Sequence, residues 1–324
     1  MGSMSSCRIC GANGLKDFEA REMMFGLREK FIYQECPSCL SIQIKHIPEN
    51  LAKYYPKNYN AYHKKLTSEE NRLKRFFKKK LAKDYLEDND NWISKQMEKR
   101  FGLGHLKKLK PSNVDLSSKI LDVGTGNGSR LVSLSKYGFN NLVGIEPFID
   151  KDIHYDSGVV VYAESIFEHN GSYDLIMFNH VFEHVVQPLK VLEKAGELLS
   201  QEGSIQISIP VADSEAYHRY GKDWVALDPP RHLHVFSKQG IRNFVQKAGF
   251  EVVGELYDGS SYQFWGSEQY RKDIVLRSEE SYYTSKENSI FSKDQIDNYE
   301  KEAIRLNEQA KGDTACFYLK RVSR

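Results

Sequence analysis

The sequence lacks any apolar run of the roughly 18 residues that a transmembrane helix requires, and its mean hydropathy is −0.57. It also lacks a strong charge bias, because 46 Lys and Arg residues oppose 44 Asp and Glu residues. Nucleic acid is therefore not the default partner. The first residues do not resemble a secretory signal, so we expect a cytoplasmic protein whose cysteines stay reduced. With 40% hydrophobic and 28% charged residues, the chain is not disordered as a whole.

Cysteine is scarce, with five in 324 residues, but four of them lie in two Cys-x2-Cys pairs near the start. The pairs are Cys7 with Cys10 and Cys36 with Cys39. Four thiolates at such spacing predict a closed tetrahedral zinc site of the structural kind, with a short hairpin between the pairs. Four unrelated buried thiols, or a redox pair, fit this spacing less well. Cys316 lies in an apolar stretch and is expected in the core.

Residues 64–110 are basic, with 15 Lys and Arg against 7 Asp and Glu. Apolar residues recur there every four positions, which predicts an amphipathic helix with a basic outer face: Leu73, Phe77, Leu81 and Tyr85. Such a face is usually only solvated. The alternative is attraction to phosphate in lipid, nucleotide or RNA, which leaves peripheral membrane contact open.

The chain therefore divides into three expected parts. Residues 1–60 form a zinc-binding module, and residues 61–110 form a basic helical linker. Pro111-Ser112 marks a boundary, after which residues 111–324 form the catalytic body.

A glycine loop follows the first strand of that body. Residues 120–123 are a short buried-strand pattern, and glycines recur at Gly124, Gly126 and Gly128 before a helical stretch. Strand, glycine turn and helix form a nucleotide site, because backbone must approach the ligand without Cβ interference. A second strand ends at Glu146, whose carboxylate can accept hydrogen bonds from both ribose hydroxyls.

Strands and helices then alternate to the end of the chain. Strands are expected at 142–146, 159–162, 173–178, 204–209 and 251–257, and helices at 130–137, 188–199 and 239–248. This order predicts an α/β protein with a parallel sheet and ligands beyond the carboxyl ends of its strands. A last apolar strand at 315–322 is expected to pair back antiparallel.

These motifs resemble the class I S-adenosylmethionine-dependent methyltransferases, in particular Asp122-Val123-Gly124, Glu146 and Glu183-His184-Val185. The stretches 231–237 and 263–268 resemble a bacterial subgroup found with polysaccharide and natural-product genes. The cysteine pairs are similar to the zinc-binding lobe of sugar C-methyltransferases. Those enzymes are longer, and we expect no counterpart of their further C-terminal domain in these 324 residues.

The resemblance implies a Rossmann-like sheet of order 3-2-1-4-5-7-6 and a bound S-adenosylmethionine. It implies that Asp122 and the glycine loop hold the methionine part, that Glu146 holds the ribose, and that residues 164–166 flank the adenine. Asn179 and His180 would lie beneath the sulfonium. The full implied cofactor set is Asp122, Gly124, Thr125, Gly126, Glu146, Pro147, Glu164, Ser165, Ile166 and Asn179.

An alcohol acceptor needs a general base, and histidine has a suitable pKa. His180 follows the fourth strand of the body and is the favoured base, with His232 and His234 as alternatives. His184 belongs to the widespread Glu-His-Val pattern and is expected to be structural. The polar, aromatic insertion 211–236 is expected to form a lid over the acceptor.

The preferred function is O-methylation of a sugar linked to a nucleotide, a lipid carrier or a glycan; C- and N-methylation stay open. The alternative is an RNA methyltransferase that grips the phosphate backbone with its zinc module and basic helix. A third hypothesis is a non-catalytic, zinc-stapled interaction protein. The sequence predicts no particular acceptor and no oligomeric state.

Overall fold

A computed structural model describes residues 6–56, 71–89 and 91–322. The end of the expected zinc module and residues 61–70 of the expected linker lie outside this part of the chain. No helix in the described ranges is long and apolar enough to cross a membrane.

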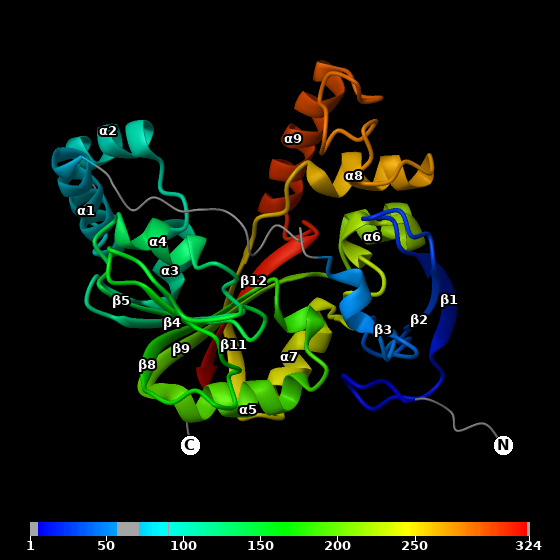
Figure 1. Ribbon diagram of the computed structural model, residues 1–324, viewed down its shortest axis with the longest axis horizontal. Helices are drawn as coiled ribbons and strands as arrows, with labels where there is room; N and C mark the ends of the chain where they lie inside the picture. Colours follow the sequence, from blue (N-terminus) through cyan, green and yellow to red (C-terminus); the bar gives the residue numbers. More distant parts are fainter. Residues whose placement is uncertain (1–5, 57–70, 90, 323–324) are drawn as a thin grey trace.

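The main sheet has eight strands in the order β11-β12-β9-β8-β4-β5-β7-β6 (Figure 1). The five strands from β9 to β7 run parallel, β12 is antiparallel to both of its neighbours, and β6 is antiparallel to β7. The bounds are β4 Lys119–Val123, β5 Asn141–Ile145, β6 Ile153–His154, β7 Val160–Tyr162, β8 Tyr173–Asn179, β9 Leu199–Pro210, β11 Phe250–Tyr257 and β12 Thr314–Arg321. The predicted fold is confirmed: seven of the strands follow the predicted order, and β6 is an additional edge strand that the sequence did not predict.

Helices cover both faces of this sheet. One face packs against α5 and α7, and the other against α1, α3 and α4. The helices are α1 Arg72–Leu86, α2 Trp92–Phe101, α3 Leu106–Leu109, α4 Ser129–Ser135, α5 Pro188–Leu198, α6 Glu215–Tyr220, α7 Lys238–Gln246, α8 Tyr262–Arg271 and α9 Lys293–Glu308, with 3-10 turns at Leu51–Tyr54, Lys110–Ser112, Phe182–His184, Gly221–Asp223 and Val225–Leu227. The expected apolar stripe of α1 is buried only in the second half of the helix: Leu81 is 2% exposed, whereas Leu73 is 68% exposed.

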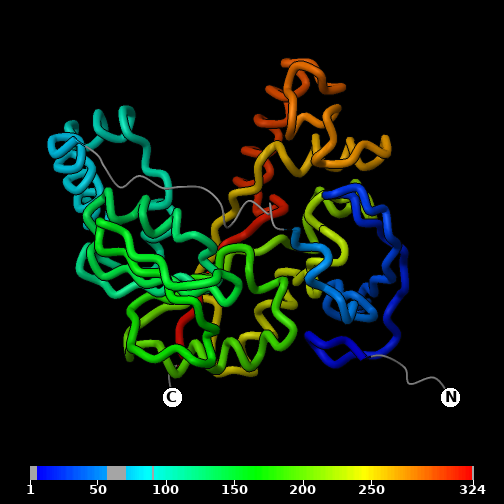
Figure 2. Tube along the Cα trace, viewed as in Figure 1, coloured from blue at the N-terminus to red at the C-terminus, as the bar shows by residue number. Residues whose placement is uncertain are grey.

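A smaller antiparallel sheet contains the predicted hairpin, formed by β1 (Lys16–Arg21) and β2 (Lys30–Glu35). The third strand, β3 (Ile42–Ile44), pairs with β10 (His234–Val235), which comes from the 211–236 segment. Figure 2 shows the blue N-terminal chain beside this yellow-green segment. The sequence did not predict that pairing.

The 211–236 segment is mostly core in this structure. Trp224, Leu227 and Leu233 are fully buried and pack with Tyr33 and Ile42 of the small sheet. Opening the segment as a lid would separate β10 from β3 and expose this cluster, so the lid remains only a prediction.

Arg231 ties the same segment to the N-terminal module. Its guanidinium is fully buried and lies 2.9 Å from Glu22 Oε1 and 2.6 Å from Asp228 Oδ1. It also donates to the carbonyl of Tyr54 at 3.3 Å. A buried cation thus balances two buried carboxylates that come from distant parts of the chain.

We expect Arg231→Met to lower the free energy of unfolding by about 3–5 kcal/mol, because it leaves two buried carboxylates without their cation. Urea unfolding measures the loss. Arg242→Met is the control, because Arg242 pairs with Glu255 at 2.7 Å but is 40% exposed, and its loss should cost below about 1 kcal/mol. Equal losses in the two variants would contradict the role given to Arg231.

Candidate functional site

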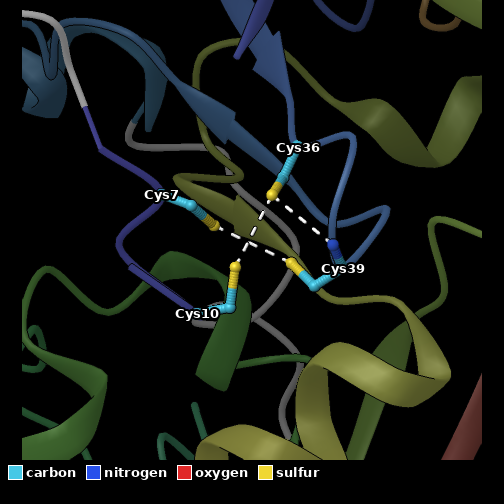
Figure 3. Close-up of side chains that lie close together, drawn as sticks. All are labelled: Cys7, Cys10, Cys36 and Cys39. Atoms are coloured by element: carbon cyan, nitrogen blue, oxygen red, sulfur yellow. Dashed lines mark hydrogen bonds between the residues drawn. The ribbon is translucent and has the colours of Figure 1, made fainter. Parts of the chain in front are cut away.

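The four N-terminal cysteines converge on one point (Figure 3). The Sγ atoms of Cys7 and Cys39 are 3.8 Å apart, and those of Cys10 and Cys36 are 3.6 Å apart. Four sulfurs about 2.3 Å from a central ion lie about 3.8 Å from one another, so this cluster has the size of a tetrahedral zinc site. Cys316 lies apart from the cluster, fully buried in β12 as predicted.

The glycine loop turns tightly between β4 and α4. The N–H groups of Gly124 and Thr125 both donate to the carbonyl of Ile145, at 2.9 and 3.2 Å, which anchors the loop to the end of β5. Gly124 and Gly126 have φ of +67° and +60°, a region that side chains disfavour. A Cβ on Gly124 would also lie 2.5 Å from a methyl group of Val181. The loop therefore requires glycine for both its backbone and its packing.

Two buried acids flank the loop. Asp122 accepts hydrogen bonds from the Thr125 hydroxyl at 2.8 Å and the Asn179 amide at 3.0 Å. Glu146 accepts from the N–H of Gly126 at 3.0 Å, and burial raises the pKa of both carboxyls. Direct hydrogen bonds thus link the residues that we expect to contact the cofactor. They join Asp122 to Asn179, and Glu146 to the glycine loop.

The residues expected around the adenine follow β7. Ile166 is buried, and Glu164 is hydrogen-bonded to His169. The N–H and hydroxyl of Ser165 both donate to Glu168, at 2.9 and 2.6 Å, so these donors are already engaged. Pro147 is exposed directly after Glu146. The cofactor roles of these residues remain predictions.

A pocket of about 350 Å³ lies at the carboxyl edge of the main sheet, where that edge meets the N-terminal module and α8. Nine of its thirteen lining residues are His, Asp, Ser, Thr or Tyr, so hydrogen-bonding side chains and apolar groups line it together. The lining is formed by Met24, His180, His184, Pro210, Val225, Ala226, Asp228, His232, Asp258, Ser260, Tyr262, Asp313 and Thr314.

Two of the three candidate bases line this pocket. His180 directly follows β8, its side chain is 50% exposed, and its Nδ1 lies 3.4 Å from Glu183 Oε1. His232 is buried and donates from Nδ1 to the carbonyl of Ala226 at 2.8 Å. Burial lowers the pKa of His232 to about 4, so its ring is neutral near pH 7.

His234 lies elsewhere. It is buried in β10, paired with Gln43, and it does not belong to the pocket lining. Burial lowers its pKa to about 3. This position argues against His234 as the base, because a base must come within hydrogen-bond reach of the acceptor.

Sequence reasoning missed much of the pocket. His184, expected to be structural, lines it, and its Nδ1 bonds the carbonyl of Arg231 at 2.9 Å and lies 3.1 Å from the Tyr55 hydroxyl. Asp258 and Asp313 also face the pocket, and burial raises the pKa of Asp313 to about 6. No local motif marks Asp258 and Asp313, because they lie beside the ends of β11 and β12, far apart in the sequence.

Known proteins share parts of this sequence. EEF1A lysine methyltransferase 2 of Danio rerio is 33% identical over 165 residues, which cover 49% of this chain and 65% of that protein. The ubiquinone biosynthesis O-methyltransferase of Escherichia coli O9:H4 is 29% identical over 150 residues, covering 42% and 59%. The chain thus spans less than two thirds of the length of these relatives.

Solved structures match a larger share of the chain at lower identity. A putative methyltransferase of Haloferax volcanii, in complex with the activator Trm112, is 16% identical, covers 71% of this chain and 92% of its own, and has a TM-score of 0.44. An S-adenosylmethionine-dependent methyltransferase of Archaeoglobus fulgidus is 15% identical, covers 72% and 100%, and has a TM-score of 0.42.

The family model of the methyltransferase domain matches residues 73–255, which is more than half of the chain. The matched range contains the glycine loop, both buried acids and all three candidate bases. The protein therefore belongs to the methyltransferase domain family, in agreement with the class I resemblance.

Proposed function

We propose that the enzyme methylates a hydroxyl oxygen of a sugar that is linked to a nucleotide, a lipid or a glycan. The hydrogen-bonding side chains that line the pocket carry this proposal. Its histidines, aspartates, serine, threonine and tyrosine offer hydrogen bonds on several sides, which suits an acceptor with many hydroxyls. Its lining includes no lysine or arginine among the described residues, so a phosphate of the acceptor would lie outside it.

The chemistry follows from position. S-adenosylmethionine supplies a methyl group on a sulfonium, whose leaving group is neutral, so catalysis rests mainly on aligning the acceptor oxygen. His180 stands where β8 ends, beside Asn179, and its exposed ring faces the pocket. His180 would remove the hydroxyl proton. The nearby Glu183 carboxylate would stabilise the imidazolium that forms.

The RNA alternative requires the zinc module and the basic helix to share one surface. In Figure 1, α1 and the small sheet lie on opposite sides of the main sheet. One RNA backbone segment would have to cross the whole molecule to contact both. This arrangement favours a small polar acceptor over RNA.

The proposal is tested by following labelled methyl transfer from S-adenosylmethionine into nucleotide sugars, lipid-linked sugars, glycan extracts, RNA and lysine peptides. We expect label in a sugar fraction, with the methyl group on oxygen when the product is analysed by NMR. Label only in RNA or in the lysine peptides would contradict the proposal. The lysine peptides are included because one relative is named a lysine methyltransferase.

His180→Asn should reduce turnover by about 10²–10⁴-fold, the usual contribution of a positioned base. Asn is a suitable replacement because His180 has φ of +54°, a region that Asn tolerates well. Cofactor affinity, measured by calorimetry, should stay near that of the wild type.

His218→Asn is the control, because His218 is exposed on α6 and lies outside the pocket lining. Its turnover should match that of the wild type. If His180→Asn also keeps turnover within a few-fold, the role of base passes to His232, or the reaction needs no base.

A further inference from the structure

Glu183 is a fully buried carboxylate beside two histidines. Its side chain is 0% exposed, and neither of its oxygens accepts a hydrogen bond from the part of the chain that the structure describes. Within those same residues, the ion-pair partners within 4.0 Å are His180 at 3.4 Å and His232 at 3.9 Å. A buried charge of this kind is costly unless a cation balances it.

Two imidazoles beside Glu183 are held with a free nitrogen. His184 and His232 use Nδ1 to bond the carbonyls of Arg231 and Ala226, at 2.9 and 2.8 Å. A carbonyl only accepts, so in each neutral ring Nδ1 carries the proton and Nε2 carries the lone pair. The Tyr55 hydroxyl, 3.1 Å from Nδ1 of His184, is then a second acceptor for that N–H. Histidine ligands of metals are oriented by hydrogen bonds of this kind.

We infer that Glu183, His184 and His232 bind a divalent transition-metal ion at the wall of the acceptor pocket. Ligand atoms of the three residues all lie within 4.8 Å of one another. Ligands about 2.0–2.2 Å from an ion can be at most about 4.4 Å apart, so small side-chain rotations close the site. Two histidines and one carboxylate suit Mn²⁺, Fe²⁺, Co²⁺ or Zn²⁺ and leave coordination positions open.

The site opens toward the acceptor. His184 and His232 both line the pocket, so the open positions face the space where the substrate oxygen would lie. Asp228 Oδ2, 3.9 Å from His232 Nε2, is a further acidic group on the same side. An ion there would draw electron density from an acceptor oxygen and lower the pKa of its hydroxyl. The site does not depend on the acceptor being a sugar.

The test uses the full-length, zinc-loaded protein and Mn²⁺, which has little affinity for four thiolates. Loss of the free Mn²⁺ signal in electron paramagnetic resonance measures binding. We expect one Mn²⁺ per chain in the wild type and an Mn²⁺ affinity more than 100-fold lower in Glu183→Gln. Losing a group that only hydrogen-bonds to a metal ligand already lowers metal affinity by about 10–100-fold, and losing a ligand should lower it further. Glu197→Gln, on the exposed side of α5, should bind like the wild type. Zinc content and S-adenosylmethionine affinity verify the fold of each variant.

A measurement on the wild type keeps the inference testable if Glu183→Gln does not fold. Substoichiometric Mn²⁺ should broaden the imidazole NMR signals of His184 and His232 but leave those of the exposed His154 sharp. Stoichiometric binding with this pattern supports the site. Co²⁺ is titrated in parallel. The site is overturned if neither Mn²⁺ nor Co²⁺ binds at millimolar concentration, or if Glu183→Gln binds Mn²⁺ as well as the wild type. Glu183 then serves only as the partner of His180.

Discussion

Gly126→Val should reduce S-adenosylmethionine affinity by at least about 100-fold, or about 2.7 kcal/mol. Gly126 has φ of +60°, and a β-branched residue is a true outlier there. The loop would have to move to relieve this strain. Its N–H would then leave Glu146 Oε2, now 3.0 Å away, and displace the carboxylate expected to hold the ribose. Calorimetry with purified protein measures the loss.

Gly249→Val separates this effect from general strain. Gly249 also has a positive φ, +77°, and has open space around it, but it lies in the turn before β11. It should lose stability and keep cofactor affinity within about three-fold. Wild-type affinity in Gly126→Val would show that the cofactor does not lie against this loop.

The double substitution Cys36→Ser and Cys39→Ser should remove the zinc and unfold most of residues 6–56. Structural zinc supplies folding free energy directly, about 10–16 kcal/mol in small zinc-finger peptides. Metal analysis should fall from one equivalent per chain to near zero, and hydrogen exchange of β1, β2 and β3 should rise sharply.

The loss of folded structure should extend to the acceptor pocket but not to the cofactor loop. The zinc module holds β10 through β3, and the Ser237 hydroxyl donates to the carbonyl of Cys39. Residues 231–237, which include His232, would therefore lose their support. We expect turnover to fall by at least about ten-fold, while cofactor affinity changes by less than three-fold because the glycine loop belongs to the other sheet.

Cys316→Ser provides the matched control, because this fifth cysteine is buried in β12, away from the cluster. It should retain one zinc per chain. Full zinc content in the Cys36/Cys39 variant would contradict the four-thiolate site. Full turnover without zinc would mean that the module does not support the pocket.

The sequence by itself determined the elements of the main sheet and its cofactor loop. Short apolar runs such as 120–123 and 142–146 form strands because both of their faces are buried, and this pattern is local. The glycines of the loop and the two Cys-x2-Cys pairs also act within a few residues of one another. Their geometry is therefore largely set by the order of residue types along the chain.

Only the tertiary structure decided which residues form the pocket that we propose for the acceptor. The sequence offered His234 as an alternative base to His232, but the pairing of β10 with β3 places His234 in the core of another sheet. Glu183 and His184 looked like a structural motif, but the turn after β8 places them against His232 from a different segment. These contacts join residues between about 50 and about 190 positions apart, so no local periodicity encodes them. They depend on which strands meet at the edge of the sheet, and long-range packing decides that.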